Sequence, residues 1–201
     1  MYAHLNRYPA QRLLQLNTYI VAPKVFTPKE SASIIEFGTS KELIEATTGQ
    51  NKKDKEARAS SVRFIGANAD TNWIFRKLDH AIEWANEHYY GFDLNGYESF
   101  QFTEYTSDVH GHYNWHVDMH LNSKDLNTSG LRKLSASVIL NTDYEGGEFQ
   151  VSNGNQNKPV TVSAAVGDVI VFPGFVPHRV SPVTAGTRYS VVVWVLGPKF
   201  V

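Results

Sequence analysis

The stretch Arg188-Tyr-Ser-Val-Val-Val-Trp-Val-Leu196 decides the fold class. Its β-branched and aromatic residues are typical of a strand, and it is apolar on both faces for most of its length. A strand of this kind has to be covered on both sides. We therefore expect it inside a sheet that has a further layer of structure packed against each face.

Upstream of this stretch, the chain from Tyr97 onward consists of short β-rich segments. Turn signals such as Gly146-Gly147, Asn153-Gly154 and Gly167-Asp168 separate them. Eight short strands are typical of a double-sheet jelly roll, the architecture that cupins also use. The sequence therefore predicts a mainly β, double-stranded β-helix core. The candidate strands are 97–106, 112–119, 133–141, 147–152, 159–163, 168–173, 176–181 and 187–196.

Two helices are predicted in the first half of the chain. Thr27-Pro28-Lys29-Glu30 combines an N-cap, a proline at the first helical position and a capping-box glutamate, and the helix should end at Gly38 or soon after. The second helix is predicted from about Asn72 to Tyr90, with Gly91 as its stop. Its apolar residues at helical spacing are Ile74, Leu78, Ile82 and Ala85.

The whole chain, 1–201, is expected to form a single domain. Residues 1–95 would be a helical support region that covers the outer face of the sheet, and residues 96–201 the jelly-roll catalytic core. Between the two helices, residues 41–61 are polar and charged. We interpret them, together with 120–133, as mobile loops that become ordered over the site when substrate binds.

Composition excludes several classes of protein. With 19 basic and 20 acidic residues the formal net charge is −1, which argues against a dedicated nucleic-acid binder. The absence of cysteine excludes disulfides and thiolate metal sites. Met1–Pro9 has no signal-like apolar region and no later run reaches membrane-spanning length, so a soluble cytoplasmic protein is the expectation. No feature specifies an oligomeric state.

Candidate metal ligands concentrate in His110-Gly-His-Tyr-Asn-Trp-His-Val-Asp-Met-His120. Alternate residues of a strand point to the same face, so His116 and Asp118 can reach one point together. The third ligand has to come from elsewhere, and His178 starts a late strand that a jelly roll brings beside the early ones. We interpret the remaining histidines of the segment, His110, His112 and His120, as loop or rim residues.

Two histidines and one carboxylate on one face leave three coordination positions open. That number suits non-haem iron(II) oxygenases, because oxygen and a bidentate cosubstrate can both bind. Zinc is more often held in a tetrahedral site with one open position. The alternative is that His116, Asp118 and His178 are ordinary polar residues whose hydrogen bonds are satisfied within the protein.

Arg188 is the candidate anion anchor. It follows His178 by ten residues, across a turn, so we expect it on the neighbouring strand. A buried arginine is costly unless a carboxylate pairs with it. Its planar fork suits the distal carboxylate of a dicarboxylic acid. The alternative is a pair with a protein acid such as Asp143 or Glu148.

These motifs together resemble the prolyl 4-hydroxylase-like 2-oxoglutarate oxygenases, and the PKHD-type hydroxylases of bacteria and phages most of all. The resemblance covers about 97–198, and the motifs occur in the family's order and spacing. They are Gln101-Phe-Thr-Glu-Tyr105, Tyr113-Asn-Trp-His116-Val-Asp118, Arg132-Lys-Leu-Ser135, Tyr144-Glu-Gly-Gly-Glu148, Gly167-Asp-Val-Ile-Val-Phe-Pro173 and His178-Arg-Val-Ser-Pro-Val-Thr-Ala-Gly-Thr-Arg188.

The resemblance implies a role for each matching residue. His116, Asp118 and His178 would be the iron ligands, Arg188 would pair with the far carboxylate of 2-oxoglutarate, and Tyr105 would hydrogen-bond this cosubstrate. The resemblance assigns the substrate side of the site to Tyr113, Arg132 and Trp194. These three could instead be two core aromatics and a solvated arginine. Ile139 departs from the family, where many members carry an aromatic residue beside the cosubstrate.

The reaction that the resemblance implies is hydroxylation of a C–H bond, with succinate and carbon dioxide as coproducts. It requires Fe(II), 2-oxoglutarate and O2, with ascorbate as an accessory reductant. The expected substrate is a prolyl residue in a peptide or protein. Alternatives are a free amino acid or small metabolite, a nucleic-acid demethylase, a cupin-like enzyme that would have no use for Arg188, and a non-catalytic jelly-roll binding module.

Overall fold

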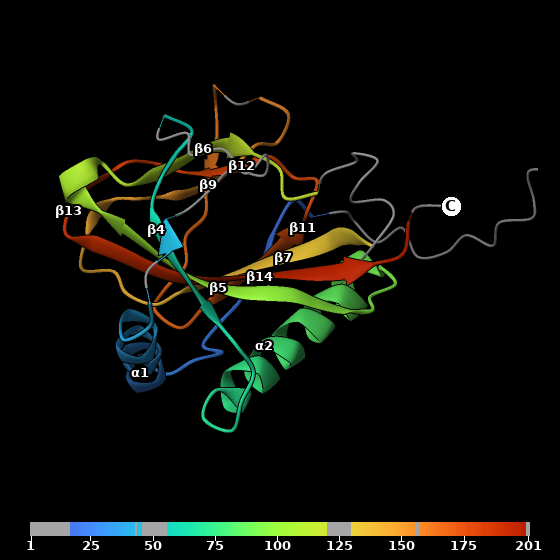
Figure 1. Ribbon diagram of the computed structural model, residues 1–201. Coiled ribbons are helices and arrows are strands. Elements are labelled where there is room, and N and C mark those ends of the chain that lie inside the picture. The colour runs from blue at the N-terminus through green and yellow to red at the C-terminus, as the bar shows by residue number, and fades with distance from the viewer. Residues whose placement is uncertain (1–16, 43, 46–55, 120–129, 156, 200–201) are drawn as a thin grey trace, which may run out of the picture.

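Two β-sheets face each other in the computed structural model, and two helices pack against the outer face of the larger sheet (Figure 1). The structure describes residues 17–42, 44–45, 56–119, 130–155 and 157–199. The helical elements are α1 (Pro28–Thr39), α2 (Asn72–Ala85), the π-helical turn η2 (Asn86–Tyr90) and the 3-10 turn η3 (Ser107–Val109). The strands are β1 (Ile20–Ala22), β2 (Ile44–Glu45), β3 (Arg58–Ala59), β4 (Ser61–Ile65), β5 (Gly96–Thr106), β6 (His112–His116), β7 (Leu131–Ile139), β8 (Glu145–Gly146), β9 (Phe149–Val151), β10 (Val160–Thr161), β11 (Val169–Pro173), β12 (His178–Val180), β13 (Val183–Ala185) and β14 (Thr187–Gly197).

The larger sheet has the order β1-β11-β7-β14-β5-β4-β2, and the smaller one β10-β9-β12-β6-β3. β8 and β13 form a separate two-stranded sheet. Strands that lie far apart in sequence, such as β6 and β12, pair directly, as a double-stranded β-helix requires. The fold class predicted from the sequence is therefore confirmed.

β14 lies inside the larger sheet, between β7 and β5, as its two apolar faces predict. Val191, Val193 and Val195 belong to the core beneath the helices. The alternate residues Arg188 and Ser190 are also buried, but face the space between the two sheets. This interior-facing side of β14 carries the polar residues of the site.

Helix α1 begins where the capping box predicts. The Thr27 hydroxyl accepts a hydrogen bond from the Glu30 backbone N–H at 3.2 Å, and the Thr27 N–H donates to the Glu30 carboxylate at 2.8 Å. Helix α2 continues into η2 and ends at Gly91, which adopts the left-handed conformation at φ 65°. Both predicted helices are confirmed in their extent.

The helices bury their apolar residues against the larger sheet. Ile34 of α1 and Ile82 of α2 join Val193 in this first core cluster. A second cluster, which includes Ile170 and Phe172, fills part of the space between the two sheets. Burial of each such side chain contributes about 1.5–3 kcal/mol relative to its exposure to water. Both clusters fix the strands that carry the site.

The N-terminal half contributes strands as well as helices, which the sequence analysis did not predict. β1 pairs with β11, and β4 pairs with β5, so they extend the larger sheet on both sides. β2 and β3 lie within 41–61, which was expected to be a loop. Strands of two to five residues are too short to show a clear alternation of apolar and polar residues.

The predicted strand 112–119 ends at His116. The backbone N–H groups of Asp118 and Met119 both donate to the carbonyl oxygen of Gly174, at 2.9 and 2.8 Å, and the chain bends there. The loop expectations for 46–55 and 120–129, and the reading of His120, lie outside the described residues. No described helix has the length and apolar character needed to cross a membrane.

Candidate metal centre

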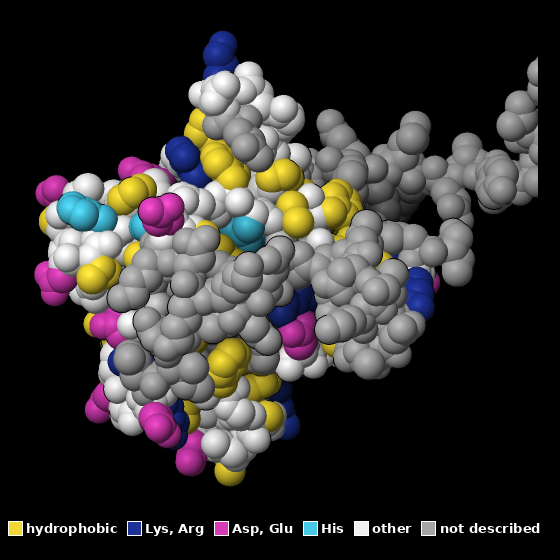
Figure 2. Space-filling model, turned by 45° about the horizontal axis from the view of Figure 1, so that its top comes forward, with side chains coloured by type: hydrophobic (Ala, Val, Ile, Leu, Met, Phe, Trp, Pro, Cys, Tyr) yellow, Lys and Arg dark blue, Asp and Glu magenta, His cyan; other side chains and the backbone are white. Residues whose placement is uncertain are grey.

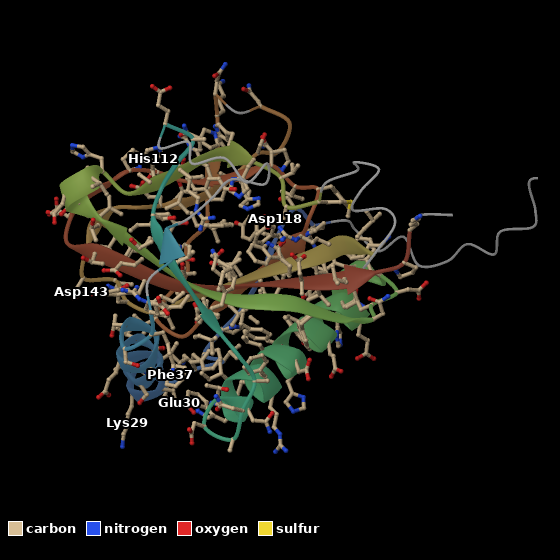
Figure 3. The ribbon with its side chains drawn as sticks, viewed as in Figure 1. Lys29, Glu30, Phe37, His112, Asp118 and Asp143 are labelled. Atoms are coloured by element: carbon tan, nitrogen blue, oxygen red, sulfur yellow. The ribbon has the colours of Figure 1, made fainter. Side chains whose placement is uncertain are left out.

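The three predicted metal ligands meet between the two sheets. His116 ends β6, His178 begins β12, and these two residues are direct partners in the antiparallel pair. Asp118 follows β6 after the bend, and Figure 3 shows it between the sheets. The ligand atoms of all three residues lie within 4.8 Å of one another. They are therefore close enough to bind one ion.

Hydrogen bonds fix the imidazole rings in the orientation that metal binding requires. The Nδ1 atom of His116 lies 2.8 Å from the Asn114 carbonyl oxygen, and Nδ1 of His178 lies 2.9 Å from that of Val176. An Nδ1–H that donates to a carbonyl leaves the Nε2 lone pair free. Nε2 of His116 lies 3.7 Å from Oδ1 of Asp118, and Nε2 of His178 lies 3.5 Å from Oδ2 of the same carboxylate.

Burial and charge put His116 and Asp118 in the protonation states of metal ligands. Burial and the nearby His178 lower the pKa of His116 to about 3. Burial alone would raise the pKa of Asp118, but His178, His116 and the hydroxyl of Ser135 outweigh it, so this pKa is lowered. At neutral pH the site offers a neutral imidazole at His116 and a carboxylate at Asp118, as a metal ligand set requires.

Aromatic rings hold the two histidines in place. The Tyr113 ring stacks on His116 with the centroids 3.5 Å apart, and the Arg58 guanidinium carbon lies 4.6 Å from the Tyr113 ring centroid. Phe172 packs against His178 at 4.6 Å. The structure thus places Tyr113, predicted to contact substrate, directly beside a candidate metal ligand.

Ser135 is a further site residue that the sequence analysis did not single out. Its hydroxyl donates to Oδ2 of Asp118 at 2.6 Å, and the side chain is fully buried on β7. Such a bond holds the carboxylate in one orientation. Ser135 lies three residues after Arg132 in a quoted motif, but no spacing rule indicated that it would reach Asp118.

We expect Ser135→Ala to raise the Fe(II) concentration needed for half-maximal binding by about 10-fold or more, because loss of such an outer hydrogen bond typically costs 10–100-fold. Isothermal titration with Fe(II) under anaerobic conditions measures this change. Ser137→Ala is the matched control, since Ser137 lies on the same face of β7 and makes no described contact with the ligands. Equal affinities in the two variants would exclude the positioning role of Ser135.

The interior face of the larger sheet is polar beside the metal ligands. Cross-strand partners on this face include Thr103 with Ser190 and Arg188 with Tyr105. Such a buried polar surface is unusual between two sheets, where apolar residues normally interdigitate. The buried polar side chains are Gln101, Thr103, Ser135, Ser137, Arg188 and Ser190.

Arg188 has unused donors inside the protein. The side chain is 1% exposed, and Nη1 donates to the Ser190 hydroxyl at 3.0 Å. Its Nε and Nη2 are buried without a hydrogen-bond partner among the described residues. Tyr105 lies beside it, with the guanidinium carbon 5.4 Å from the ring centroid. A buried guanidinium with two unpaired donors has the geometry to pair with a carboxylate.

Two expectations for Arg188 change with the structure. Arg188 and His178 are not on neighbouring strands, because β14 belongs to the larger sheet and β12 to the smaller. The proposed alternative partners are engaged elsewhere in the described chain. Asp143 accepts a hydrogen bond from Asn141, and Glu148 accepts one from Ser181.

Arg132 and Trp194, the other residues expected to contact substrate, lie against each other. The Arg132 guanidinium is 4.0 Å from the Trp194 ring centroid. Glu98, which the sequence analysis did not consider, accepts two hydrogen bonds of 2.6 Å from Arg132. Burial alone would lower the pKa of Arg132, but the hydrogen bonds and the charge of Glu98 have the larger effect, so this pKa is raised.

The other described histidines do not join the cluster. His112 contacts the carbonyl oxygens of His110 and Glu56, and Figure 3 shows it away from Asp118. His80 lies on α2, beneath the larger sheet, and His88 in η2. Within the described residues, the ligand set of two imidazoles and one carboxylate is complete with the predicted three.

The comparison with protein families agrees with this chemistry. A profile of the 2OG-Fe(II) oxygenase superfamily matches residues 100–196, which contain all three ligands and Arg188. The chain contains a 2OG-Fe(II) oxygenase domain. Two tests within the structure fit this family: the ligand set suits Fe(II), and the unpaired donors of Arg188 suit the far carboxylate of 2-oxoglutarate.

Curated relatives of this oxygenase domain are PKHD-type hydroxylases. One from Psychrobacter sp. (strain PRwf-1) is 38% identical over 89 residues, which are 41% of this chain and 32% of that protein. One from Delftia acidovorans is 50% identical over 54 residues, which are 26% of this chain and 22% of that protein. The match therefore spans about a third of these relatives or less.

Solved structures share the fold of this oxygenase over most of the chain. A prolyl hydroxylase from Trichoplax adhaerens, in complex with a hypoxia inducible factor peptide fragment, has a TM-score of 0.74 at 18% identity and covers 92% of this chain and 86% of its own. A prolyl-4-hydroxylase of Pseudomonas putida has a TM-score of 0.71 at 18% identity, with coverage of 92% and 96%.

Proposed function

We propose that the protein is a 2-oxoglutarate- and Fe(II)-dependent dioxygenase that hydroxylates a C–H bond. The observation that carries this proposal is the combination of a buried two-histidine, one-carboxylate cluster with Arg188, whose buried donors lack a partner. A binding module would gain nothing from either feature. A metal-dependent enzyme that does not use 2-oxoglutarate would have no use for the unpaired donors of Arg188.

Each residue has a definite part in this proposal. His116 and His178 would each hold the iron through Nε2, and Asp118 would hold it through a carboxylate oxygen. Arg188 would pair with the far carboxylate of 2-oxoglutarate and Tyr105 would hydrogen-bond this cosubstrate, beside the buried polar face of the larger sheet. When bound, iron and 2-oxoglutarate supply an oxidant from O2, with succinate and carbon dioxide as coproducts. The protein excludes water and fixes the geometry.

The proposed substrate is a prolyl residue within a peptide or protein. The shared fold with prolyl hydroxylases supports this choice, and one of those structures contains a peptide. Tyr113 and Trp194 place aromatic surface near the iron ligands, which suits an apolar ring. A free amino acid or small metabolite is the second candidate, because a small substrate could bind in the same place.

A nucleic-acid substrate would require a continuous cationic track beside the site. On the face shown in Figure 2, acidic and basic side chains are mixed among the described residues. With a formal net charge of −1, the composition also favours a peptide or small molecule.

The proposal predicts that purified protein with Fe(II), ascorbate, O2 and 2-oxoglutarate forms succinate, and that a proline-containing peptide gains the mass of one oxygen on proline. Mass spectrometry of a pool of prolyl peptides measures both products. If succinate forms while no prolyl peptide gains oxygen and free amino acids do, the peptide substrate is wrong and the reaction class stands. If no succinate forms under any condition, the reaction class is wrong as well.

A further inference from the structure

A groove lies beside helix α2, where the helix meets the end of strand β1. Its volume is about 350 Å³, and its lining residues are mainly apolar. Ala22 and Pro23 line it from the end of β1, and His80, Ala81 and Trp84 line it from α2. Figure 1 shows no described element on the outer side of α2. Within the described part of the chain, the groove is therefore open.

The helix face at this groove departs from the pattern of an amphipathic helix. Leu78 and Ile82 are buried in the core beneath the larger sheet, and the opposite face should then be polar. Trp84 is nevertheless 38% exposed, and its ring centroid lies 5.5 Å from that of Tyr89 in the adjoining turn η2. An exposed aromatic ring that borders an apolar groove is typical of an interaction surface.

The charges on this face favour a basic partner. Glu83 and Glu87 are exposed, and each follows a groove residue of α2 by three positions, so their carboxylates border this face of the helix. Lys77, which also lines the groove, pairs with Glu30 at 2.8 Å. Even with the exposed Arg76 included, the balance of these charges is negative. The partner that fits is a short segment with apolar side chains and positive charge.

A segment of this chain has that character. Residues 9–16, Pro9-Ala-Gln-Arg-Leu-Leu-Gln-Leu16, lie outside the described residues and contain three leucines, one arginine and no acidic residue. Leu16 precedes Ala22 of the groove lining by six residues, so the chain keeps it within about 20 Å of the groove. A segment tethered at so short a distance has a high effective concentration at the groove.

We propose that residues 9–16 dock in the groove between α2 and the end of β1. The leucines of the segment cover the exposed ring of Trp84, and Arg12 lies near the carboxylates of Glu83 and Glu87. The contact forms within one molecule. The inference goes beyond the proposed catalytic function, because α2 packs on the outer face of the larger sheet and the candidate metal ligands lie between the two sheets.

Disulfide trapping in the full-length protein tests the proposal, because the chain contains no cysteine that would interfere. Leu13→Cys, Leu14→Cys or Leu16→Cys is combined, one at a time, with His80→Cys. Mass spectrometry of the linked peptides gives the rate of disulfide formation under mild oxidation. At least one of the three pairs should form its disulfide within one molecule at least about 10-fold faster than the matched control pair.

The matched control replaces His80→Cys by Arg76→Cys. Arg76 is exposed on the same helix but does not line the groove. Loss of its positive charge would favour the approach of a basic segment, so this control works against the proposal. Trp84→Ala removes a wall of the groove and should slow the fast pair about threefold or more, at an unchanged rate of the control pair and an unchanged circular dichroism spectrum.

A charge exchange tests the position of Arg12. Arg12→Glu should slow the fast pair at least about twofold, a small effect because exposed ion pairs are weak. Glu87→Arg in the same protein should restore the rate. If Glu87→Arg slows the reaction further instead, Arg12 does not lie near the acidic side of α2.

Two results would overturn the docking of residues 9–16. If all three leucine pairs form their disulfides no faster than the Arg76 pair, the segment does not occupy the groove. Disulfides that join two molecules, in place of the intramolecular ones, would assign the groove to a second copy of the chain. Neither result bears on the oxygenase function, which the formation of succinate tests separately.

Discussion

Alanine at His116, Asp118 or His178 is expected to reduce turnover at least 100-fold and to abolish stoichiometric Fe(II) binding. In the proposed centre each residue would supply one of the three ligands found among the described residues. With two ligands left, the ion would have no fixed position relative to 2-oxoglutarate. The loss should be similar for each of the three, although His116 is less buried than the other two.

Metal content after anaerobic reconstitution, together with succinate formation, measures this effect. Asp118→Asn provides a variant of nearly unchanged volume, so that a loss of iron cannot be ascribed to a cavity. His112→Ala is the control on the same strand, because His112 contacts only backbone carbonyl oxygens in the described structure. Full iron-dependent activity in any one of the three ligand variants would remove that residue from the centre.

Arg188→Met is expected to raise the 2-oxoglutarate concentration for half-maximal activity by at least about 10-fold. Hydrogen bonds to a charged group contribute about 1.5–3 kcal/mol, and about 1.4 kcal/mol is a factor of ten. Methionine fills much of the volume without a charge, so the fold should be preserved. Because Arg188 lies in the larger sheet and is not one of the three candidate ligands, Fe(II) affinity should stay within about twofold of wild type.

The measurement is a 2-oxoglutarate titration of succinate formation, with circular dichroism and thermal unfolding as checks on the fold. Arg188→Lys should recover part of the affinity, since it restores the charge without the planar fork. An unchanged 2-oxoglutarate requirement in a folded Arg188→Met protein would mean that another residue holds the far carboxylate.

Local patterns in the sequence were sufficient to predict the two helices, because capping residues and apolar spacing specify them. The capping box at Thr27 predicted the start of α1, and the apolar spacing predicted α2 up to Gly91. The predicted ligands also meet in the structure, although the strand ends before Asp118. A jelly roll pairs β6 with β12, so the topology brings His178 to His116 even though the local reasoning about Asp118 assumed a longer strand.

The contacts that Glu98 and Ser135 make with other strands left no pattern in the sequence from which they could be predicted. Glu98 reaches Arg132 only because a register shift in β5 reverses the side-chain alternation after Tyr97. A bulge of this kind cannot be read from a run of polar and aromatic residues. The role of Ser135 could not be predicted for a related reason. Its hydrogen bond to Asp118 joins β7 of the larger sheet to the bend after β6 of the smaller sheet.

Anaerobic absorption titration tests the central claim most directly, because a 2-oxoglutarate chelated to Fe(II) produces a charge-transfer band that neither component gives alone. Wild-type protein should develop the band only when both are present, at about one equivalent of Fe(II). His178→Ala should give none, and Arg188→Met should require at least about 10-fold more 2-oxoglutarate. Absence of the band in wild type, or an undiminished band in His178→Ala, would contradict an iron centre that binds 2-oxoglutarate at His116, Asp118 and His178.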